Sequence, residues 1–496
     1  MGTTKKIIDT HVRHMHKLFN NYVNLPIQAK ASFWFLVCSF LNKGILFITT
    51  PIFTRLLTAQ EYGEYSVFVS WYSMAMIVIT LNLSWGVYMQ GLVKFEDDHT
   101  AFSSSLQGLT ICLVLVWATL YFLFHNWINN LIGLNTCKLC CMFIMIWTSA
   151  VFGFWSAEKR VNLQYKQLVL ITVLASIFSN LLGIYLVLYT EDKVLGRILG
   201  ITVVQLLLYG WMAAIQIFKG KKFYSKKYWL YALTFNIPLI PHYFSLTVLN
   251  NSDRIMIDTL VGKTEAGIYS LAYSIGLIMT IVSTSVMATL RPWIFQKIKH
   301  NSSNEITKPA LSCLVLIGLV NIILIAIAPE IVCFFAPVEY YDAIWIIPPV
   351  AMSTYFIFSY DLFASFEFYY EKTTFIMFAS IVSALLNILL NYVFINLFGY
   401  IAAGYTTIVS YMIYAIGHYM FMQKICRDFD NVVVFNGKVL VLLASLFLFY
   451  AGVFTVLYNF RLIRYCFIIF TVLLLYVFKD KVNNIIHIFL VLKKVK

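Results

Sequence analysis

The chain has 496 residues, of which 61% are hydrophobic and only 12% are charged, and its mean hydropathy is +0.80. Soluble domains carry roughly 25% charged residues, so this composition excludes a soluble globular protein. The formal net charge of +14 would suggest a nucleic-acid partner in a soluble protein. In a chain this apolar we expect the basic residues to fix the orientation in a membrane instead, and we predict no nucleic-acid partner.

Apolar segments of about 20 residues recur along the chain, separated by short polar breaks. This length matches a membrane-spanning helix, whereas the strands of an outer-membrane barrel are shorter and alternate. We therefore predict an all-α, polytopic membrane protein with about 14 spans. The predicted spans are 32–54, 66–93, 105–126, 139–158, 168–190, 197–218, 229–259, 266–290, 309–330, 343–366, 372–395, 401–423, 437–458 and 463–478.

The loops between the spans allow a test of this topology. When the loops alternate from a cytoplasmic N-terminus, most of the 36 Lys and Arg residues fall in cytoplasmic segments, as the positive-inside rule requires. The densest run is Lys219–Lys227, with five lysines in nine residues, and we expect it to touch anionic lipid head groups. We therefore predict a multi-pass protein whose N- and C-termini are both cytoplasmic.

A short motif occurs twice in the chain. Leu56–Ser66 and Leu260–Ser270 align without a gap at an offset of 204 residues and share Leu, Glu, Gly, Tyr and Ser, including Gly63 and Gly267. The same offset places apolar segments on apolar segments. Because each half holds an even number of spans, we predict two parallel halves related by a pseudo-twofold axis along the membrane normal. We expect the turns that carry Gly63 and Gly267 to form an exterior gate.

The repeat and the basic linker divide the chain into six predicted segments. They are a cytoplasmic or interfacial N-terminus (1–31), an N-terminal six-helix bundle (32–218), the basic cytoplasmic linker (219–228), a C-terminal six-helix bundle (229–423), two further transmembrane helices (437–478) and a cytoplasmic tail (479–496).

A lysine lies in the middle of the first predicted span. Lys43 sits beside Asn42 and Gly44 in an otherwise apolar segment. A lysine near the bilayer centre costs about 2.5–3.5 kcal/mol unless it faces a polar interior. We expect Lys43 to face a water-filled cavity, where it would attract a phosphate charge at 4 Å by about 4 kcal/mol. The alternative is a pairing with a carboxylate elsewhere in the bundle.

Acidic and basic residues also lie together in the seventh predicted span. Arg254 and Asp258 are four residues apart and share a helix face, so one interpretation is an intrahelical pair. The other interpretation places Arg254 at the outer mouth of a cavity and makes Asp253 a candidate cation or proton site. Glu61, in the first copy of the motif, is a second candidate for ion coupling.

Two arginines close predicted spans: Arg55 at an outer end and Arg291 at an inner end. Each is a candidate ligand for a phosphate group, either of lipid or of substrate. Pro238 and Pro241 remove backbone hydrogen bonds from the seventh span, so we expect a bend or hinge there.

Three further ionisable residues lie toward the inner ends of their predicted spans: Asp361, Glu367 and His418. We expect them to be satisfied by neighbours or to reach the membrane surface, and not to form a proton relay.

Motifs of catalysis and of cofactor binding are absent from the sequence. It contains no phosphate-binding loop, no dinucleotide glycine pattern and no catalytic triad or carboxylate pair. Cys137, Cys140 and Cys141 lack the second pair or histidine that a metal site needs. We therefore predict neither an enzyme nor a metal or cofactor, and an H+ gradient, an Na+ gradient or the membrane potential as the candidate driving forces.

The segment Thr50–Ser66 (TPIFTRLLTAQEYGEYS) resembles the hallmark of bacterial polysaccharide flippases of the O-antigen (Wzx) type. Asn251–Arg254 followed by Ala266–Ser270 is similar to the corresponding element of the second half. Arg55 and Arg254 fall in motif positions, whereas Lys43 and Arg291 do not. The resemblance covers nearly the whole chain, although many members of the family have 12 spans and lack the two additional helices.

The resemblance implies a fold related to MATE-type multidrug exporters and lipid II flippases, with two six-helix bundles around a cavity and transport by alternating access. The implied substrate is an oligosaccharide repeat unit on undecaprenyl diphosphate, destined for lipopolysaccharide O-antigen, capsule or exopolysaccharide. It implies the bacterial cytoplasmic (inner) membrane, with membrane lipids and other polysaccharide-assembly proteins as partners. We expect a monomer, because one chain would hold a complete cavity.

Two other functions fit the hydropathy. A drug or cation antiporter shares the implied fold, but its first span would be expected to carry a carboxylate where this chain has Lys43. A membrane glycan polymerase or ligase would be expected to have a large exterior loop with catalytic residues, and the predicted exterior loops are all short.

Overall fold

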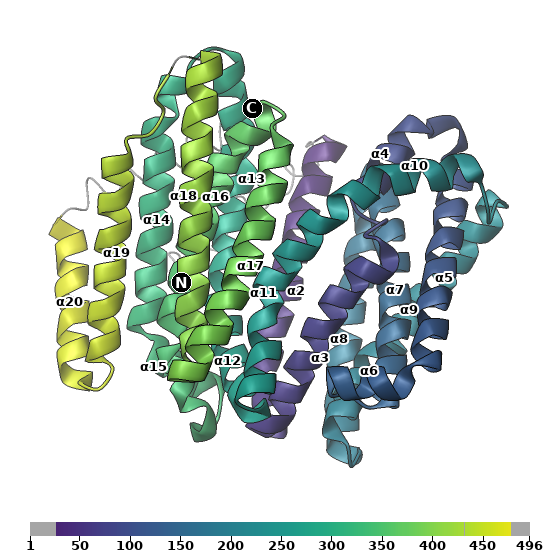
Figure 1. Ribbon diagram of the computed structural model, residues 1–496, viewed down its shortest axis with the longest axis horizontal. Coiled ribbons are helices and arrows are strands. Elements are labelled where there is room, and N and C mark those ends of the chain that lie inside the picture. The colour runs from purple at the N-terminus through teal and green to yellow at the C-terminus, as the bar shows by residue number, and fades with distance from the viewer. Residues whose placement is uncertain (1–25, 431, 478–496) are drawn as a thin grey trace, which may run out of the picture. The chain divides into compact units, whose positions relative to one another are not determined.

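The computed structural model describes residues 26–430 and 432–477, and all regular elements in these ranges are helices (Figure 1). The expected fold class, an all-α polytopic membrane protein, is confirmed. Most of the predicted interfacial N-terminus and the predicted tail 479–496 lie outside the described residues.

Contacts between residues divide the chain into two compact units. Unit 1 joins Ile79–Ile237 to the chain up to Thr50, and unit 2 joins Pro51–Val78 to the chain from Pro238 onward. The chain therefore changes unit at three places, two of which immediately precede a proline. The two six-helix bundles that the repeat predicts, 32–218 and 229–423, stay predictions. The units differ from those ranges because 51–78, although it precedes the linker, groups with unit 2.

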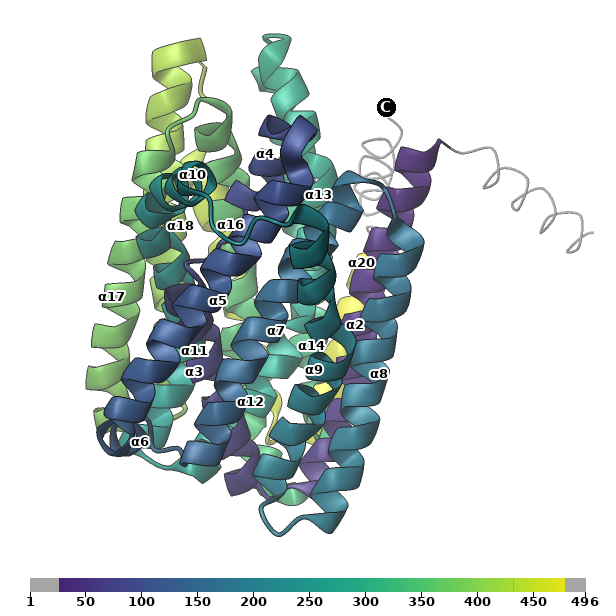
Figure 2. The same cartoon turned by 90° about the vertical axis from the view of Figure 1, so that its right-hand side faces the viewer.

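Unit 1 is built around a central helix, α9, which contacts α5, α7 and α8 (Figure 2). An aromatic core joins α4 and α10 to α5 and α7, and it includes Tyr88, Phe102, Phe154 and Tyr228. The elements of this unit are α2 (Ile27–Leu56, as far as Thr50), α4 (Val87–Lys94), η1 (Glu96–Asp98), α5 (His99–Leu123), α6 (His125–Ile132), α7 (Thr136–Val161), α8 (Tyr165–Tyr189), α9 (Lys193–Gly220) and α10 (Lys226–Asn236).

Unit 2 is built on two long helix pairs, α16 with α18 and α11 with α17 (Figure 1). Its elements are α3 (Ala59–Thr80), η2 (Ile237–Leu239), α11 (Ile240–Leu260), α12 (Lys263–Gly276), α13 (Ile278–Lys299), η3 (Ser303–Glu305), α14 (Thr307–Ala326), α15 (Ala328–Phe335), η4 (Val338–Trp345), α16 (Ile347–Tyr369), α17 (Thr373–Phe398), α18 (Ala402–Asp430), α19 (Gly437–Leu457) and α20 (Arg461–Val477).

The helices of the described residues include nine that are long and apolar enough to cross a membrane. The pair η4 and α16, bent by 46°, makes a tenth. Each predicted span, as far as its residues are described, falls on a helix or on consecutive helices, including the long helices α2, α3 and α18.

Several predicted spans fall on more than one helix, and two of these breaks have a clear backbone cause. The predicted span 66–93 is divided between α3 and α4, because Leu81, Asn82 and Gly86 have φ values of 51°, 52° and 55°, which a right-handed helix cannot contain. The predicted span 229–259 breaks at the short 3₁₀ turn η2, which contains Pro238, and α11 starts with Pro241 in its first turn. The expected break at these prolines is therefore present, while a hinge role stays a prediction.

The two tail helices are docked on unit 2. α19 packs against α14 and α16, and α20 packs against α19. Tyr458 donates to the carbonyl oxygen of Ile325 at 2.7 Å, and Arg464 forms an ion pair with Glu330. Arg464 is 2% exposed, so this pair fixes α20 with a nearly buried charge.

The crossing of α8 and α9 depends on small residues. A Cβ atom added at Gly200 would lie 2.5 Å from both the Cα and the N atom of Gly183. Because these are backbone atoms, the two helices would have to separate. By contrast, the atom closest to an added Cβ at Gly210, on the same helix, is Leu206 Cδ1 at 3.6 Å.

We expect Gly200→Ala to destabilise unit 1 by about 1–3 kcal/mol through overpacking. Gly210→Ala, the matched control on α9, should be neutral or should stabilise by about 0.5–1 kcal/mol, because alanine favours a helix over glycine. Apparent unfolding midpoints of the detergent-solubilised proteins would measure both. Equal midpoints for the two variants would contradict the close crossing.

Candidate functional site

The two copies of the repeated motif meet within unit 2. They form the first turns of α3 and α12, where a Cβ atom added at Gly63 would lie 1.8 Å from the carbonyl oxygen of Lys263. A Cβ atom added at Gly267 would lie 2.1 Å from the carbonyl oxygen of Ala59. The two helices therefore cross with their backbones in contact, and only glycine fits at either position. We call this contact the glycine crossing.

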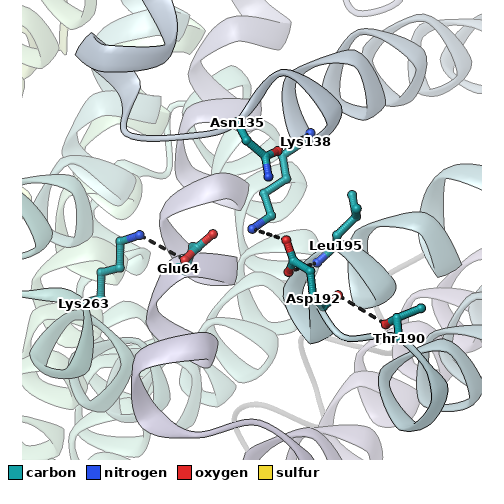
Figure 3. Close-up of polar contacts among 7 residues, drawn as sticks. All are labelled: Glu64, Asn135, Lys138, Thr190, Asp192, Leu195 and Lys263. Atoms are coloured by element: carbon teal, nitrogen blue, oxygen red, sulfur yellow. Dashed lines mark hydrogen bonds and ion pairs between the residues drawn. The ribbon is translucent and has the colours of Figure 1, made fainter.

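An ion pair lies beside the glycine crossing. Lys263 Nζ is 3.0 Å from Glu64 Oε2, and both side chains are partly exposed (Figure 3). A second polar contact joins the backbone N–H of Ala59 to Glu339 Oε1 at 3.1 Å. A partly exposed ion pair contributes about 0–1 kcal/mol, so the Glu64–Lys263 pair can break without a large penalty.

Glu61, an expected ion-coupling residue, caps α3. Its Oε2 atom accepts from the backbone N–H of Thr58 at 2.8 Å, while Thr58 Oγ1 accepts from the backbone N–H of Glu61 at 3.2 Å. This reciprocal arrangement is a capping box, and its Thr-x-x-Glu pattern is visible in the sequence. An ion-coupling role for Glu61 stays a prediction.

Arg55 lies just before the glycine crossing, at the end of α2. It donates to the carbonyl oxygens of Pro51 at 2.8 Å and Phe334 at 2.9 Å. The neighbouring Thr54 hydroxyl donates to the carbonyl oxygen of Phe335 at 2.5 Å. The end of α2 is thus attached to α15 by hydrogen bonds to backbone carbonyl oxygens. In the hydrogen bonds of the described residues, Arg55 has no carboxylate acceptor.

Asp253 lies in a buried polar cluster formed by four helices. This residue of α11 is 1% exposed. Its carboxylate accepts from Tyr269 of α12 at 2.5 Å, from Asn391 of α17 at 2.6 Å and from Thr407 of α18 at 2.8 Å. Tyr269 is the tyrosine of the second motif copy, so the motif supplies both the glycine crossing and a donor to Asp253.

The oxygen atoms around Asp253 extend the cluster. Asn391 also donates to Asn387 Oδ1 at 3.2 Å, and Ser252 donates to the same oxygen at 3.2 Å. Thr406 donates to Asn391 Oδ1. Carboxylate, amide and hydroxyl oxygens are the ligands that hard cations take, and a buried carboxylate also takes a proton. The geometry fits either expectation for Asp253.

Arg254 does not pair with Asp258 among the described ion pairs. Instead it donates to Asn251 Oδ1 at 3.2 Å and to the carbonyl oxygen of Asn250 at 3.3 Å. Its guanidinium lies 4.4 Å from the ring centroid of Tyr273. All three partners are uncharged, although Asp253 lies near enough to interact electrostatically with Arg254. The proposed intrahelical pair with Asp258 is not among the described ion pairs.

Arg291, on α13, is paired within the protein. It forms an ion pair with Asp361 of α16, and its Nε atom donates to Ser365 at 3.3 Å. About one third of each side chain in the ion pair is exposed. Phosphate groups were the predicted partners of Arg291, because Asp361 lies 70 positions further along the chain and no local pattern reports their proximity.

The side chain of Lys43 lies outside the described part of the structure, although its backbone belongs to α2. Both interpretations of Lys43, as a cavity lysine or as a member of an ion pair, therefore stay predictions.

Lys138 of α7 is a buried lysine that the sequence analysis did not select. It is 5% exposed and lies 2.9 Å from Asp192 in the turn between α8 and α9 (Figure 3). Burial raises the pKa of Asp192, but hydrogen bonds from the Leu195 N–H and the Lys138 ammonium outweigh it, so the pKa is lowered overall. Because Asn135 also caps α7 at the Lys138 N–H, this cluster ties the first turn of α7 to the α8–α9 turn.

An apolar groove of 420 Å³ lies between α16, α18 and the tail helix α19. Its walls include Phe356, Phe363, Met412, Ile416, Leu440 and Leu448. A hydrocarbon chain is the ligand class that such walls accept.

These observations describe a helical membrane protein of two units with an internal repeat and a buried carboxylate cluster, which is the architecture of transporters. A family model described as "Polysaccharide biosynthesis protein" matches residues 29–298, more than half of the chain. The protein therefore belongs to the polysaccharide biosynthesis protein family. The resemblance to proteins of polysaccharide biosynthesis is confirmed at the level of the family.

Similar proteins agree with the family and with the fold. The Lsg locus putative protein 1 of Haemophilus influenzae is 24% identical over 387 residues, which cover 72% of this chain and 89% of that protein. An inward-facing multidrug resistance MATE family transporter has a TM-score of 0.58 at 12% identity, covering 77% of this chain and 94% of its own. The lipid II flippase MurJ, inward closed, has a TM-score of 0.57 at 16% identity, covering 86% and 99%.

Replacing Asp253 by alanine should destabilise unit 2. The change leaves the Tyr269, Asn391 and Thr407 donors without their buried acceptor, and one such donor costs about 1–3 kcal/mol. Asp258→Ala, on the same helix but half-buried, is the matched control and should have a smaller effect. Thermal unfolding in detergent would compare them; equal losses would contradict the special role of the Asp253 cluster.

Proposed function

We propose that the protein is a flippase that moves oligosaccharide repeat units linked to undecaprenyl diphosphate across the bacterial cytoplasmic membrane. The product would serve O-antigen, capsule or exopolysaccharide synthesis. The extent of the family match carries this proposal, because residues 29–298 contain both copies of the repeated motif. The shared fold with MurJ adds support. We further propose that it acts as a monomer, without catalytic activity, alongside other polysaccharide-assembly proteins.

The diphosphate needs positive charge that can be reached during transport. Arg55 and Arg254 are hydrogen-bonded only to uncharged acceptors in the hydrogen bonds described above, so phosphate oxygens can replace those acceptors with a gain in electrostatic energy. Asp361 neutralises the charge of Arg291 before the substrate arrives, and Arg291 would then exchange Asp361 for phosphate. Lys43 is the fourth proposed ligand, on the ground of its place in the first span.

Alternating access requires a contact that can open. It also requires hinge positions at which the chain can bend. The glycine crossing is our proposed exterior gate, because its contacts are backbone van der Waals contacts and partly exposed polar pairs. Pro238 and Pro241 are the proposed hinge, and this proposal is supported by the change of unit at Pro238. An H+ or Na+ gradient acting on Asp253, or on Glu61, or the membrane potential would supply the energy.

The lipid part of the substrate needs an apolar path. We propose that the polyprenyl chain stays outside the polar path and lies in the groove between α16, α18 and α19. This assignment gives the two tail helices a role: without α19 one wall of the groove is missing.

A cation antiporter is the second candidate, and the buried oxygen cluster at Asp253 is the observation that favours it. Its substrate would be an organic cation exchanged against a bound ion. The alternative of a glycan polymerase or ligase has no such supporting observation.

Deletion of the gene in its native host tests the proposal. We expect undecaprenyl-diphosphate-linked repeat units to accumulate on the cytoplasmic face while surface polysaccharide is lost, and mass spectrometry of extracted lipids would identify the sugar. Export of single repeat units without polymerisation would instead favour a polymerase. Unchanged lipid pools with altered drug tolerance would favour the antiporter.

Arginine variants test the proposed diphosphate ligands. Because a hydrogen bond to a charged group contributes about 1.5–3 kcal/mol, Arg55→Ala and Arg254→Ala should each lower the apparent affinity for the lipid-linked substrate by about ten- to hundredfold. Arg461→Ala, an exposed arginine of α20, is the control and should bind normally. Substrate binding to the purified, correctly folded proteins would be measured, and unchanged affinity in both variants would refute this site.

Gate variants test the glycine crossing. Gly267→Ala should weaken the closed crossing by about 1–3 kcal/mol and raise the open population by about 5–150-fold. A Ser270→Cys reporter, at a position that is 2% exposed, should then react faster with a maleimide in a cysteine-free background. Gly417→Ala is the control, because an added Cβ there meets no atom within 4 Å. Identical labelling rates would argue against a gate at this contact.

A further inference from the structure

A carboxylate and an imidazole form a second buried polar site in unit 2, separate from Asp253. Glu367 of α16 and His418 of α18 have side chains that are 0% exposed. The His418 Nδ1 atom lies 2.9 Å from Glu367 Oε1 and 3.0 Å from Oε2. From the sequence, these residues are expected to be satisfied by neighbours or to reach the membrane surface. The structure satisfies one ring nitrogen and buries both side chains completely.

Aromatic rings surround the imidazole of His418. The ring centroids of Tyr414, Phe375 and Tyr360 lie 4.5, 5.5 and 5.7 Å from that of the imidazole. Among the described residues, none forms a hydrogen bond with the Nε2 atom of His418. One nitrogen of the pair is therefore committed to the carboxylate, and the other is enclosed without a partner.

The possible protonation states of this pair differ by one proton. With Nδ1–H donating to an ionised Glu367 and a lone pair on Nε2, the pair has a net charge of −1. Addition of one proton, to Nε2 or to the carboxylate, makes the pair neutral overall. A buried uncompensated charge is unfavourable, so the sealed site prefers the state with the added proton. Contact with water stabilises the charged state and favours release of that proton.

The surrounding ionisable groups do not supply the missing positive charge. Arg291 of α13 is already neutralised by Asp361 of α16. His242 of α11 hydrogen-bonds through Nδ1 to Ser380 of α17 at 2.9 Å. Among the described residues, the hydroxyl groups of Tyr360 and Tyr414 also lie close to the pair, and both are neutral at physiological pH.

We propose that Glu367 and His418 together form a proton-binding site, which holds one exchangeable proton while it is sealed and releases it when water enters. The ligand is a proton and not a metal ion, because a single imidazole and a single carboxylate inside aromatic walls provide too few ligand atoms for a metal. The site differs from the Asp253 cluster, where three neutral donors already satisfy the carboxylate. The site would add the binding and release of one proton to the transport cycle. This role does not depend on which substrate is transported.

Histidine NMR tests this site directly. The full chain, labelled with ¹⁵N-histidine and placed in lipid nanodiscs without substrate, would be titrated between about pH 5 and pH 9, a range that brackets the ordinary histidine pKa. We expect His418 to exchange one proton, and Glu367→Gln to lower the proton affinity of His418 at least tenfold because the counter-charge is removed. His300→Gln, an exposed histidine after α13, is the control and should leave the His418 titration unchanged.

Two results would overturn the proposal. One is a His418 that keeps a single protonation state across the range in the native protein. The other is a His418 titration that Glu367→Gln does not move. The infrared band of a protonated carboxyl, followed in the native protein over the same range, gives an independent measurement if a variant does not fold. Because no transport is measured, failure of the proton site leaves the flippase proposal intact.

Discussion

The backbone contact between α3 and α12 is the constraint on which the rest of unit 2 depends. Because Gly63 and Gly267 let two helix backbones touch, Glu64 reaches Lys263 and Ala59 reaches Glu339. The same first turn of α12 leads directly to Tyr269, which donates to Asp253. A change of angle at the crossing would therefore move a donor of the buried carboxylate. Tyr269 therefore connects the proposed gate directly to the proposed ion-coupling site at Asp253.

Three acidic residues of unit 2 are stabilised in three different ways. Asp253 is surrounded by neutral donors, Asp361 by a guanidinium, and Glu367 by an imidazole. These environments respond differently to water, ions and protons, since a neutral donor cannot cancel charge while a guanidinium always does. An imidazole does so only in its protonated form. One helical unit thus contains three carboxylates with distinct chemistry, and this separation is what a protein needs if it binds an anion and a coupling ion in one cycle.

Hydropathy predicted the fold class, because the bilayer imposes length and composition on each helix separately. Nine or ten spans are found among the described residues, so the predicted number of about 14 stays a prediction. The interruption at Leu81–Gly86 was missed, since its backbone conformation leaves little trace in hydropathy. The sequence singled out Gly63, Gly267 and Asp253, whose proposed roles stay predictions, but it did not predict the residues that they contact. Asp253 is bonded to residues 16, 138 and 154 positions away, and no single-sequence pattern reports such pairs. The capping box at Glu61 was available in the sequence and was overlooked.

The segment 51–78 lies before the linker in the chain but packs with the residues that follow Pro238. It is an arm that the first half contributes to unit 2, with no segment contributed in return. A cut in the linker 219–228 would therefore leave the arm of the first fragment embedded in the second. The two halves of this protein are tied by their fold as well as by their peptide bond, and neither is expected to be a complete folding unit when made alone.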